Sequence, residues 1–334
     1  MNLKDLPKIE LHCHLDGSIR PETIISIAKK DGIEIPTENI DGIREYVMAP
    51  VDCKSLDEYL DRFTLPNKVM QTKENLKRVA YELLEDASKD NVKYIEIRFA
   101  PSLHRAKGLS FEEVIESVLE GMKEGEETYP IKSNLILSCM RTMSVKEAFK
   151  VVEAGKKYLN KGVVAIDLAA SEYENFAQKY KEPIKRAREY GYRVTIHAGE
   201  TGIGKNVLDA IKILKAERIG HGIYAKDSKE AYEILKNSHV IIEMCPTSNV
   251  QTKGVASYES HPLKEFFQDG IKVTLNTDNM TVSNTTLTNE HELMKKAQNI
   301  NIQDYKKMYL HGVDGSFASE KIKEELRKHI SIIC

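Results

Sequence analysis

The stretch RVTIHAGETGIGKNVLDAIKILKAERIGHG, residues 193–222, holds the pattern from which the fold is predicted. Its two short apolar runs, Arg193–Ala198 and Arg218–His221, are long enough for strands buried on both faces and too short for buried helices. Between them, Asn206–Lys215 has a helical pattern. A strand, a helix and a second strand in this order are typical of a parallel crossover unit.

The same alternation continues on both sides of this stretch. Further strand-like runs occur at Lys8–His14, Val92–Phe99, Ser133–Met140, Val163–Ala169, His239–Met244 and Ile271–Thr277. Helical patterns between them include Phe111–Thr128, Ser144–Leu159, Tyr180–Tyr190 and Ser228–Lys236, and Ser110, Ser144 and Ser228 are candidate caps. Eight such repeats predict an α/β protein with a (β/α)8 TIM barrel. A doubly wound open sheet is the alternative, because periodicity does not reveal strand order.

The connection between the first two strands is longer than one crossover helix requires. It runs from Leu15 to Asn91 and has helical patterns at Pro21–Asp31, Ser55–Asn67 and Lys73–Asp90. We therefore expect one barrel domain over residues 1–334, with a helical insertion at about residues 16–90. This insertion should cover the C-terminal face of the barrel, where active sites are built. Further helices are expected at Leu287–Gln298, Ile302–Leu310 and Ser319–His329.

Composition excludes several classes of protein. Hydrophobic residues make up 41% and charged residues 30% of the 334, as in a globular chain. Lys and Arg number 49 against 51 Asp and Glu, so no field of one sign attracts nucleic acid or anionic lipid. Apolar runs are far shorter than the roughly 18 residues of a membrane span, and no signal peptide pattern is present. We expect a cytoplasmic protein with no nucleic-acid, membrane or obligatory protein partner.

The first strand-like run ends in two histidines, His12 and His14. Side chains two residues apart on a strand point to the same side, so both imidazoles should face the barrel interior. Neutral imidazole is a common zinc ligand, with a metal–nitrogen distance of about 2.0 to 2.1 Å. Two histidines at this spacing, taken by themselves, pack or hydrogen-bond as often as they bind metal.

Other strand ends carry similar side chains. His197 and Glu200 come at the end of the fifth strand, His221 at the sixth, and Asp278 and Asn279 at the eighth. Taken singly, each is more easily explained as a residue that caps a turn or helix. In a barrel, however, all four strand ends meet at one face. Their coincidence predicts a metal-dependent catalytic site.

These motifs resemble those of a known family. HCHLDGS at 12–18, HAGE at 197–200, GHG at 220–222 and NTD at 276–278 occur in this order, with YIEIRFAP at 94–101 and SCMRTM at 138–143. The combination is similar to that of the adenosine deaminase family, within the metal-dependent amidohydrolase superfamily, from about residue 7 to about residue 320. The resemblance implies hydrolytic deamination of adenosine, and of deoxyadenosine, to inosine and ammonia in purine salvage. It also implies one zinc ion per chain, held by His12, His14, His197 and Asp278.

Chemistry and resemblance together suggest roles for the site residues. Bound zinc can lower the pKa of water towards about 7 and so supply a nucleophile for C6 of the purine. His221 would take the water proton or stabilise the developing charge, while Asp278 orients the same water. Glu200 would protonate N1, which needs the raised pKa of a closed pocket. By the resemblance, Asp16 binds a ribose hydroxyl near His14.

Two residues depart from the family's usual pattern. Asn279 stands where the family usually has a second aspartate, which contacts N7 of the purine. An amide donates to N7 without being protonated, so this contact should be preserved. Ala170 stands where the family usually has glycine, whose N–H is thought to contact N3. Its methyl group could crowd the ring or require another backbone conformation.

Other functions remain as alternatives. A related hydrolase of phosphotriesters or cyclic amides commonly needs a lysine between two metals, and none follows the fourth strand. A silent binding protein of this fold would be expected to lack a ligand or Glu200, and neither is missing. Adenine, AMP or a modified adenosine could replace adenosine as substrate. For AMP, only Arg20 and Lys54 are candidates to bind the phosphate.

Overall fold

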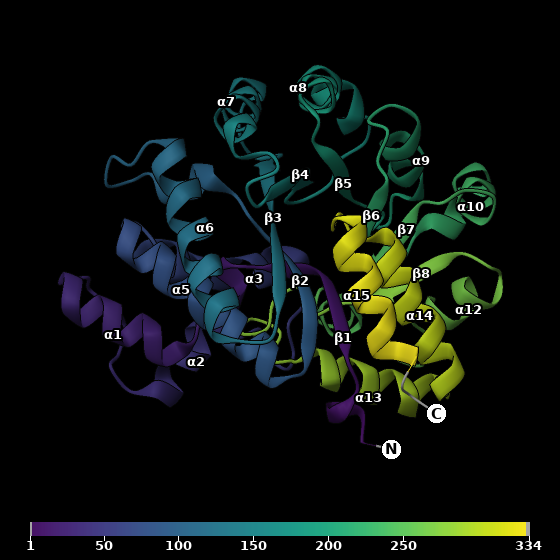
Figure 1. Cartoon of the computed structure of the whole chain (residues 1–334), viewed down its shortest axis with the longest axis horizontal. Helices are drawn as coiled ribbons and strands as arrows, with labels where there is room; N and C mark the ends of the chain where they lie inside the picture. Colours follow the sequence, from purple (N-terminus) through teal and green to yellow (C-terminus); the bar gives the residue numbers. More distant parts are fainter. Residues whose placement is uncertain (1, 332–334) are drawn as a thin grey trace.

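In the computed structural model, which describes residues 2–331, eight parallel strands form one sheet in the order β1 to β8 (Figure 1). The strands are β1 Lys8–His14, β2 Val92–Phe99, β3 Lys132–Met140, β4 Val163–Ala169, β5 Arg193–Ala198, β6 Arg218–His221, β7 Ile241–Met244 and β8 Lys272–Leu275. The chain beyond β8 meets β1 through a bridge between Cys13 and Asp278. This order confirms the (β/α)8 barrel and excludes the doubly wound sheet. The ends of the expected domain, residues 1 and 332–334, lie outside the described residues.

Helices surround the strands (Figure 1). They are α6 Phe111–Thr128, α7 Val145–Gly155, α8 Phe176–Tyr190, α9 Gly204–Lys212, α10 Lys229–Lys236, α11 Pro246–Gln251, α12 Leu263–Gln268, α13 Leu287–Gln298, α14 Ile302–Gly315 and α15 Glu320–Ser331. The caps expected from the sequence are present. Ser110 and Glu113 form a reciprocal capping box on α6, and Ser144 and Ser228 accept hydrogen bonds from the first turns of α7 and α10. No helix within residues 2–331 is long and apolar enough to cross a membrane.

Strand side chains alternate between an apolar outer layer and a polar barrel interior. On β2, Ile95, Ile97 and Phe99 belong to the main apolar core between the sheet and the helices. Glu96 and Arg98, which alternate with them, are fully buried and make ion pairs. The strands are therefore buried on both faces, as their apolar runs predicted, but the interior holds a charged network.

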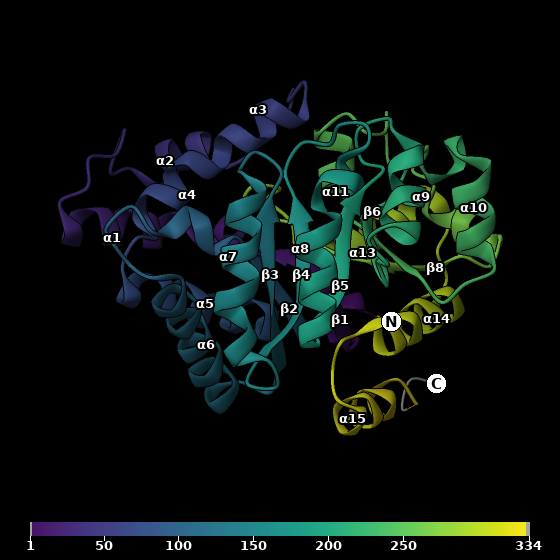
Figure 2. The same ribbon diagram turned by 90° about the horizontal axis from the view of Figure 1, so that it is seen from above.

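Five helices lie between β1 and β2, in the expected insertion. They are α1 Pro21–Asp31, α2 Ile40–Val47, α3 Leu56–Leu60, α4 Thr64–Val69 and α5 Lys73–Lys89. Helix α5 packs against α6 in the outer ring, whereas α3 lies at the opposite end of the barrel from α14 and α15 (Figure 2). We call residues 50–70, which include α3 and α4, the lid segment.

The structure differs from the sequence predictions mainly at element ends. The single helix expected at Ser55–Asn67 is divided, because Pro66 has no N–H to continue a helical ladder through Asp61–Phe63. Helix α2 was not predicted; it is short and contains Gly42, which has low helix propensity. Strand β8 stops at Leu275, two residues before the predicted end.

Candidate active site

A cavity of about 240 Å³ lies at the C-terminal ends of the barrel strands. The lid segment supplies Leu56, Tyr59, Leu60 and Phe63 to its wall. The predicted site residues that line it are His14, Asp16, Ala170, His197, Glu200, His221, Asp278 and Asn279. His12, the remaining predicted site residue, is fully buried beneath it. The structure therefore places all the predicted site residues together.

The predicted metal ligands converge on one point. Nε2 of His12 and Nε2 of His14 lie 3.3 and 3.4 Å from Oδ1 of Asp278. Nε2 of His14 lies 3.3 Å from Nε2 of His197. Donor atoms of His12, His197, His221 and Asp278 all lie within 4.8 Å of one another, so His221 also belongs to this group. Imidazole nitrogens together with a carboxylate oxygen are a donor set that suits zinc.

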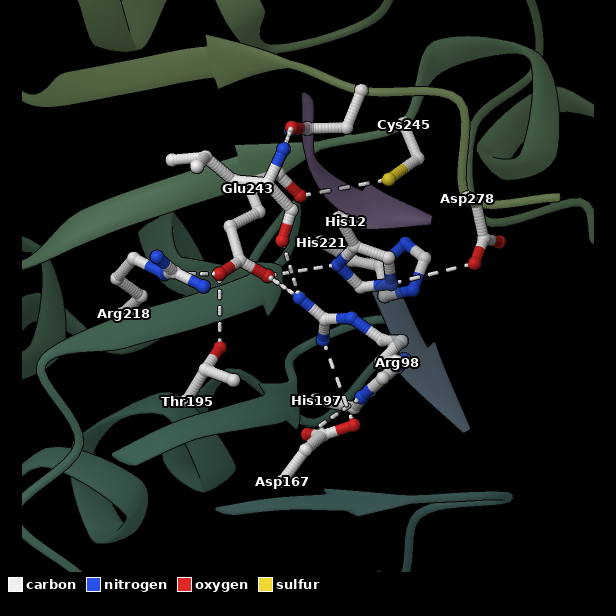
Figure 3. A network of polar contacts seen from close by, with 12 residues as sticks. His12, Arg98, Asp167, Thr195, His197, Arg218, His221, Glu243, Cys245 and Asp278 are labelled. Atoms are coloured by element: carbon white, nitrogen blue, oxygen red, sulfur yellow. Dashed lines mark hydrogen bonds and ion pairs between the residues drawn. The ribbon is translucent and has the colours of Figure 1, made fainter. Parts of the chain in front are cut away.

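Buried carboxylates fix the orientation of two of these imidazoles (Figure 3). Nδ1 of His12 lies 2.8 Å from Glu243, and Nδ1 of His197 lies 3.0 Å from Asp167. When its Nδ1 proton is donated to a carboxylate, each ring in its neutral form directs the lone pair of Nε2 towards the pocket. Nε2 of His12 is buried and has no hydrogen-bond partner in the described part of the chain. A metal ion would satisfy this atom, so the residues present fit a bound metal.

Both carboxylates are held as anions by buried arginines. Glu243 accepts hydrogen bonds from Arg98 at 2.7 Å and Arg218 at 2.5 Å, as Figure 3 shows. Burial raises the pKa of Glu243, but the charges of Arg98 and Arg218 outweigh it and bring the pKa well below its usual range. Burial also acts to raise the pKa of Asp167. The interaction with His197, whose Nδ1 lies 3.0 Å away, and the positive charge of Arg98 outweigh it and bring the pKa well below its usual range.

Three residues of the pocket wall have backbone angles that non-glycine residues rarely adopt. The φ angles are 75° at Ala170, 65° at His221 and 60° at Asp278. Each costs on the order of 1–3 kcal/mol, and such strain gathers at functional sites. Ala170 therefore keeps a left-handed conformation despite its methyl group. Arg141 secures it through a hydrogen bond of 2.7 Å from Nη1 to the Ala170 carbonyl.

Glu200 is a buried carboxyl group at the pocket wall, with 7% of its surface exposed. Burial, followed by the negative charges of Asp278 and Glu172, raises the pKa of Glu200 well above its usual range. One of its carboxyl oxygens lies 3.7 Å from Nε2 of His221. Glu200 is thus a buried carboxyl group whose surroundings favour its protonated form.

Glu172 was not singled out from the sequence, yet it holds the backbone beneath Glu200. Its two carboxylate oxygens accept hydrogen bonds from the N–H groups of Glu200 at 2.7 Å and Gly199 at 2.9 Å. The side chain of Asn206 donates to the same carboxylate at 2.7 Å. No sequence motif marks this position, because the contact joins two loops that are distant along the chain.

Glu172→Gln should therefore lower kcat/KM about tenfold while leaving the metal content unchanged. The amide has one oxygen for two backbone donors, so one N–H loses its partner and the loop carrying Glu200 loosens; supporting residues of this kind typically contribute 10- to 100-fold. Steady-state kinetics with metal analysis test this. Glu174→Gln, at an exposed neighbouring position, is the matched control. Equal kcat/KM in both variants would contradict the role.

A chain of hydrogen bonds sets the proton position on His221. The N–H of Leu263 donates to Nδ1 of His261 at 3.2 Å, so the proton of His261 is on Nε2. That nitrogen lies 3.1 Å from Oδ1 of Asn249, whose Nδ2 donates to Nδ1 of His221 at 3.0 Å. Burial lowers the pKa of His221 well below its usual range. His221 is therefore neutral and carries its proton on Nε2, towards the pocket.

Asp16 and Asn279 place unpaired polar atoms at the pocket. Oδ1 of Asp16 is buried without a hydrogen-bond partner among residues 2–331. Burial raises the pKa of Asp16 to about 6. Oδ1 of Asn279 is also buried without a hydrogen-bond partner in this part of the chain, while its Nδ2 donates one hydrogen bond to the hydroxyl of Tyr59 at 2.9 Å. Buried polar atoms are normally satisfied, so unpaired ones at a cavity mark places where a ligand can bind.

Comparisons with known proteins agree with this arrangement. The family model described as adenosine deaminase matches residues 7–332. An adenosine deaminase of Clostridium botulinum (strain Okra / Type B1) is 61% identical over 333 residues, which cover 100% of this chain and 99% of the relative.

Solved structures show the same fold. An adenine deaminase from Arthrobacter aurescens has a TM-score of 0.90 at 28% identity, covering 98% of both chains. An amidohydrolase from Burkholderia ambifaria with bound Zn has a TM-score of 0.88 at 27% identity, covering 98% of this chain and 90% of its own.

Proposed function

Because the chain belongs to the adenosine deaminase family, we propose that its pocket performs the hydrolysis of adenosine to inosine and ammonia. One observation carries the geometric side of this proposal. A buried carboxyl group, that of Glu200, lines the same cavity as a cluster of histidine and aspartate side chains that could bind a metal ion. Deamination of a purine needs these two components together, one to activate water and one to protonate the ring.

We infer that the metal is zinc and that His12, His14, His197 and Asp278 hold it. Three observations support this choice: Glu243 and Asp167 orient the rings of His12 and His197, Asp278 is a buried carboxylate beside them, and the amidohydrolase from Burkholderia ambifaria has bound Zn. When bound, zinc supplies Lewis acidity that makes water a nucleophile near neutral pH.

Glu200 moves the proton that the purine needs. Attack at C6 disrupts the aromatic ring, so N1 has to gain a proton as the tetrahedral centre forms. Burial raises the pKa of Glu200 well above its usual range, which favours the protonated form that can deliver this proton. Glu172 keeps this acid in position, because its carboxylate accepts hydrogen bonds from the N–H groups of Gly199 and Glu200.

His221 and Asp278 act on the attacking oxygen. His221 carries its proton on Nε2, so this atom donates to the oxygen and stabilises the charge that develops there. In this tautomer His221 stabilises charge, so the proton that the water loses goes to Oδ1 of Asp278, which passes it to the amine as ammonia leaves. Asp278 has Oδ2 bound by Ser248 at 2.6 Å, which leaves Oδ1 to face the ligand group and the water.

The remaining pocket residues recognise the nucleoside. The unpaired Oδ1 of Asp16 accepts a hydrogen bond from a ribose hydroxyl. The N–H of Ala170, in its left-handed conformation, faces N3, and the amide of Asn279 donates to N7. Ribose and deoxyribose both fit this scheme, because one hydroxyl suffices for Asp16.

AMP is a poorer fit than adenosine. None of the residues that line the cavity in the described chain is Lys or Arg. Arg20, a candidate from the sequence, is paired with Glu85 at 2.7 Å and Asp86 at 2.6 Å. Lys54 lines a neighbouring cavity instead. A phosphate would therefore lack a buried cation in the pocket.

One panel assay tests the function directly. Ammonia release is measured from adenosine, deoxyadenosine, adenine and AMP with the zinc-loaded enzyme. We expect adenosine and deoxyadenosine to be turned over, and kcat/KM for AMP to be lower by at least about 100-fold, the loss that an unpaired buried charge causes. Turnover of adenine in preference to both nucleosides would instead place the chain with the adenine deaminases.

A further inference from the structure

The lid segment is joined to the chain after β8 at Tyr59. The side chain of Tyr59, on α3, is 2% exposed and lines the substrate cavity. Its hydroxyl lies 2.6 Å from Oγ of Ser283 and accepts the hydrogen bond from Nδ2 of Asn279. Two residues that follow β8 are thus tied to one atom of the lid.

Apolar contacts support the same junction. Tyr59, Cys53 and Val282 form a small buried cluster separate from the main core. The N–H of Ala49 donates to the carbonyl of Val282 at 2.7 Å. The ring of Tyr59 is therefore held by apolar packing, and its hydroxyl makes the hydrogen bonds to Ser283 and Asn279.

The position of the Asn279 amide is constrained from the opposite side by Gly17. A methyl group at Gly17 would overlap Oδ1 of Asn279, so the amide oxygen lies directly against this glycine. With Oδ1 against Gly17 and one proton of Nδ2 on Tyr59, the second proton of Nδ2 is left for the cavity. Without the hydroxyl of Tyr59, no hydrogen bond recorded among residues 2–331 would orient this amide.

We propose that Tyr59 is a positioning residue through which the lid segment orients the Asn279 amide towards N7 of a bound purine. This inference rests on the proposed function of the pocket. It gives the lid a part in specificity, because the donor to N7 is oriented only while Tyr59 is in place. A purine that lacks an acceptor at position 7 loses this contact.

The product inosine and its 7-deaza analogue, in which carbon replaces N7, test the proposal by binding alone. Dissociation constants of both ligands are measured by calorimetry for the wild type, Tyr59→Phe and Asn279→Ala. The wild type should bind inosine about tenfold more tightly than 7-deazainosine, since a buried donor is left unpaired in the analogue. Tyr59→Phe keeps the ring and its packing, and should reduce this preference to about twofold, as should Asn279→Ala.

Tyr81→Phe is the matched control. It removes a hydroxyl that bonds Tyr129 outside the cavity, so the tenfold preference should persist. The double variant of Tyr59→Phe with Asn279→Ala should show no further loss of preference, because both changes remove one interaction. If Tyr59→Phe folds poorly, Ser283→Ala is an independent test. It removes only the other hydrogen-bond partner of the Tyr59 hydroxyl, so the preference for inosine should fall by a smaller factor.

The outcomes separate this inference from the function on which it rests. A full tenfold preference in Tyr59→Phe, with adenosine still deaminated by the wild type, overturns the role of Tyr59 alone. Equal binding of the two ligands to the wild type overturns the contact with N7 and the inference with it, while deamination stands. Failure of the wild type to deaminate adenosine overturns the proposed function, whatever the binding ratio.

Discussion

Glu200→Gln should lower kcat for adenosine by about 100- to 10,000-fold, the contribution of a positioned general acid. The amide fills nearly the same space and keeps a hydrogen-bonding group, but it has no acidic proton to give to N1. Binding of the purine should change little, because KM reflects contacts that the amide preserves. The loss should therefore appear in kcat rather than in KM.

Metal analysis distinguishes this result from loss of a ligand. Glu200 lies three residues after His197 along the chain, yet Glu200→Gln should retain a full equivalent of metal. Glu182→Gln, at an exposed position on α8, is the control for the loss of one carboxylate. If Glu200→Gln lost its metal, Glu200 would be a ligand and its role as an acid would be refuted.

The raised pKa of Glu200 gives the wild type a defined pH dependence. The protonated form is the active one, so activity is retained below the raised pKa and falls as the pH rises through it. The residual activity of Glu200→Gln should lack this decline, because the amide does not titrate in that range. An alkaline limb that survives the substitution would assign it to another group.

The sequence predicted the barrel because eight apolar runs alternate with helical patterns, and barrel topology then places the strand ends together. This argument brings His12, His197 and Asp278 to one face of the barrel from the sequence alone. Periodicity did not locate element ends that depend on tertiary contacts. Strand β8 stops at Leu275, beyond which the chain turns to place Asp278 at a φ of 60°.

Supporting residues were harder to predict than the ligands. Glu243 and Asp167 are single charged residues within apolar strand runs. Because a buried charge needs a partner, each could have been identified from the sequence as a residue with a specific contact. Glu172 and Asn249 carry no such signal. Glu172 contacts the backbone of Glu200 and Asn249 contacts His221, each across 28 residues of chain, so these contacts arise only from the fold.

His197→Ala should remove the metal and abolish turnover. Even the carboxylates behind such ligands contribute about 10- to 100-fold to metal affinity or activity, so loss of a ligand itself should exceed about 100-fold in each. The substitution also leaves Asp167 as a buried carboxylate without its histidine. Metal content by mass spectrometry, measured beside kcat, separates loss of the ion from loss of catalysis alone.

His239→Ala, at an exposed histidine far from the pocket wall, provides the matched control and should retain one metal per chain. Chelation of the wild type should likewise abolish activity, and added zinc should restore it, because the ligand set is held by Glu243 and Asp167 without the ion. Two equivalents of metal in the wild type would refute the single site, since His12, His14, His197 and Asp278 supply ligands for one ion. Unchanged metal content and turnover in His197→Ala would refute the assignment of His197, and the carboxylate of Asp167 would then serve only to stabilise the fold.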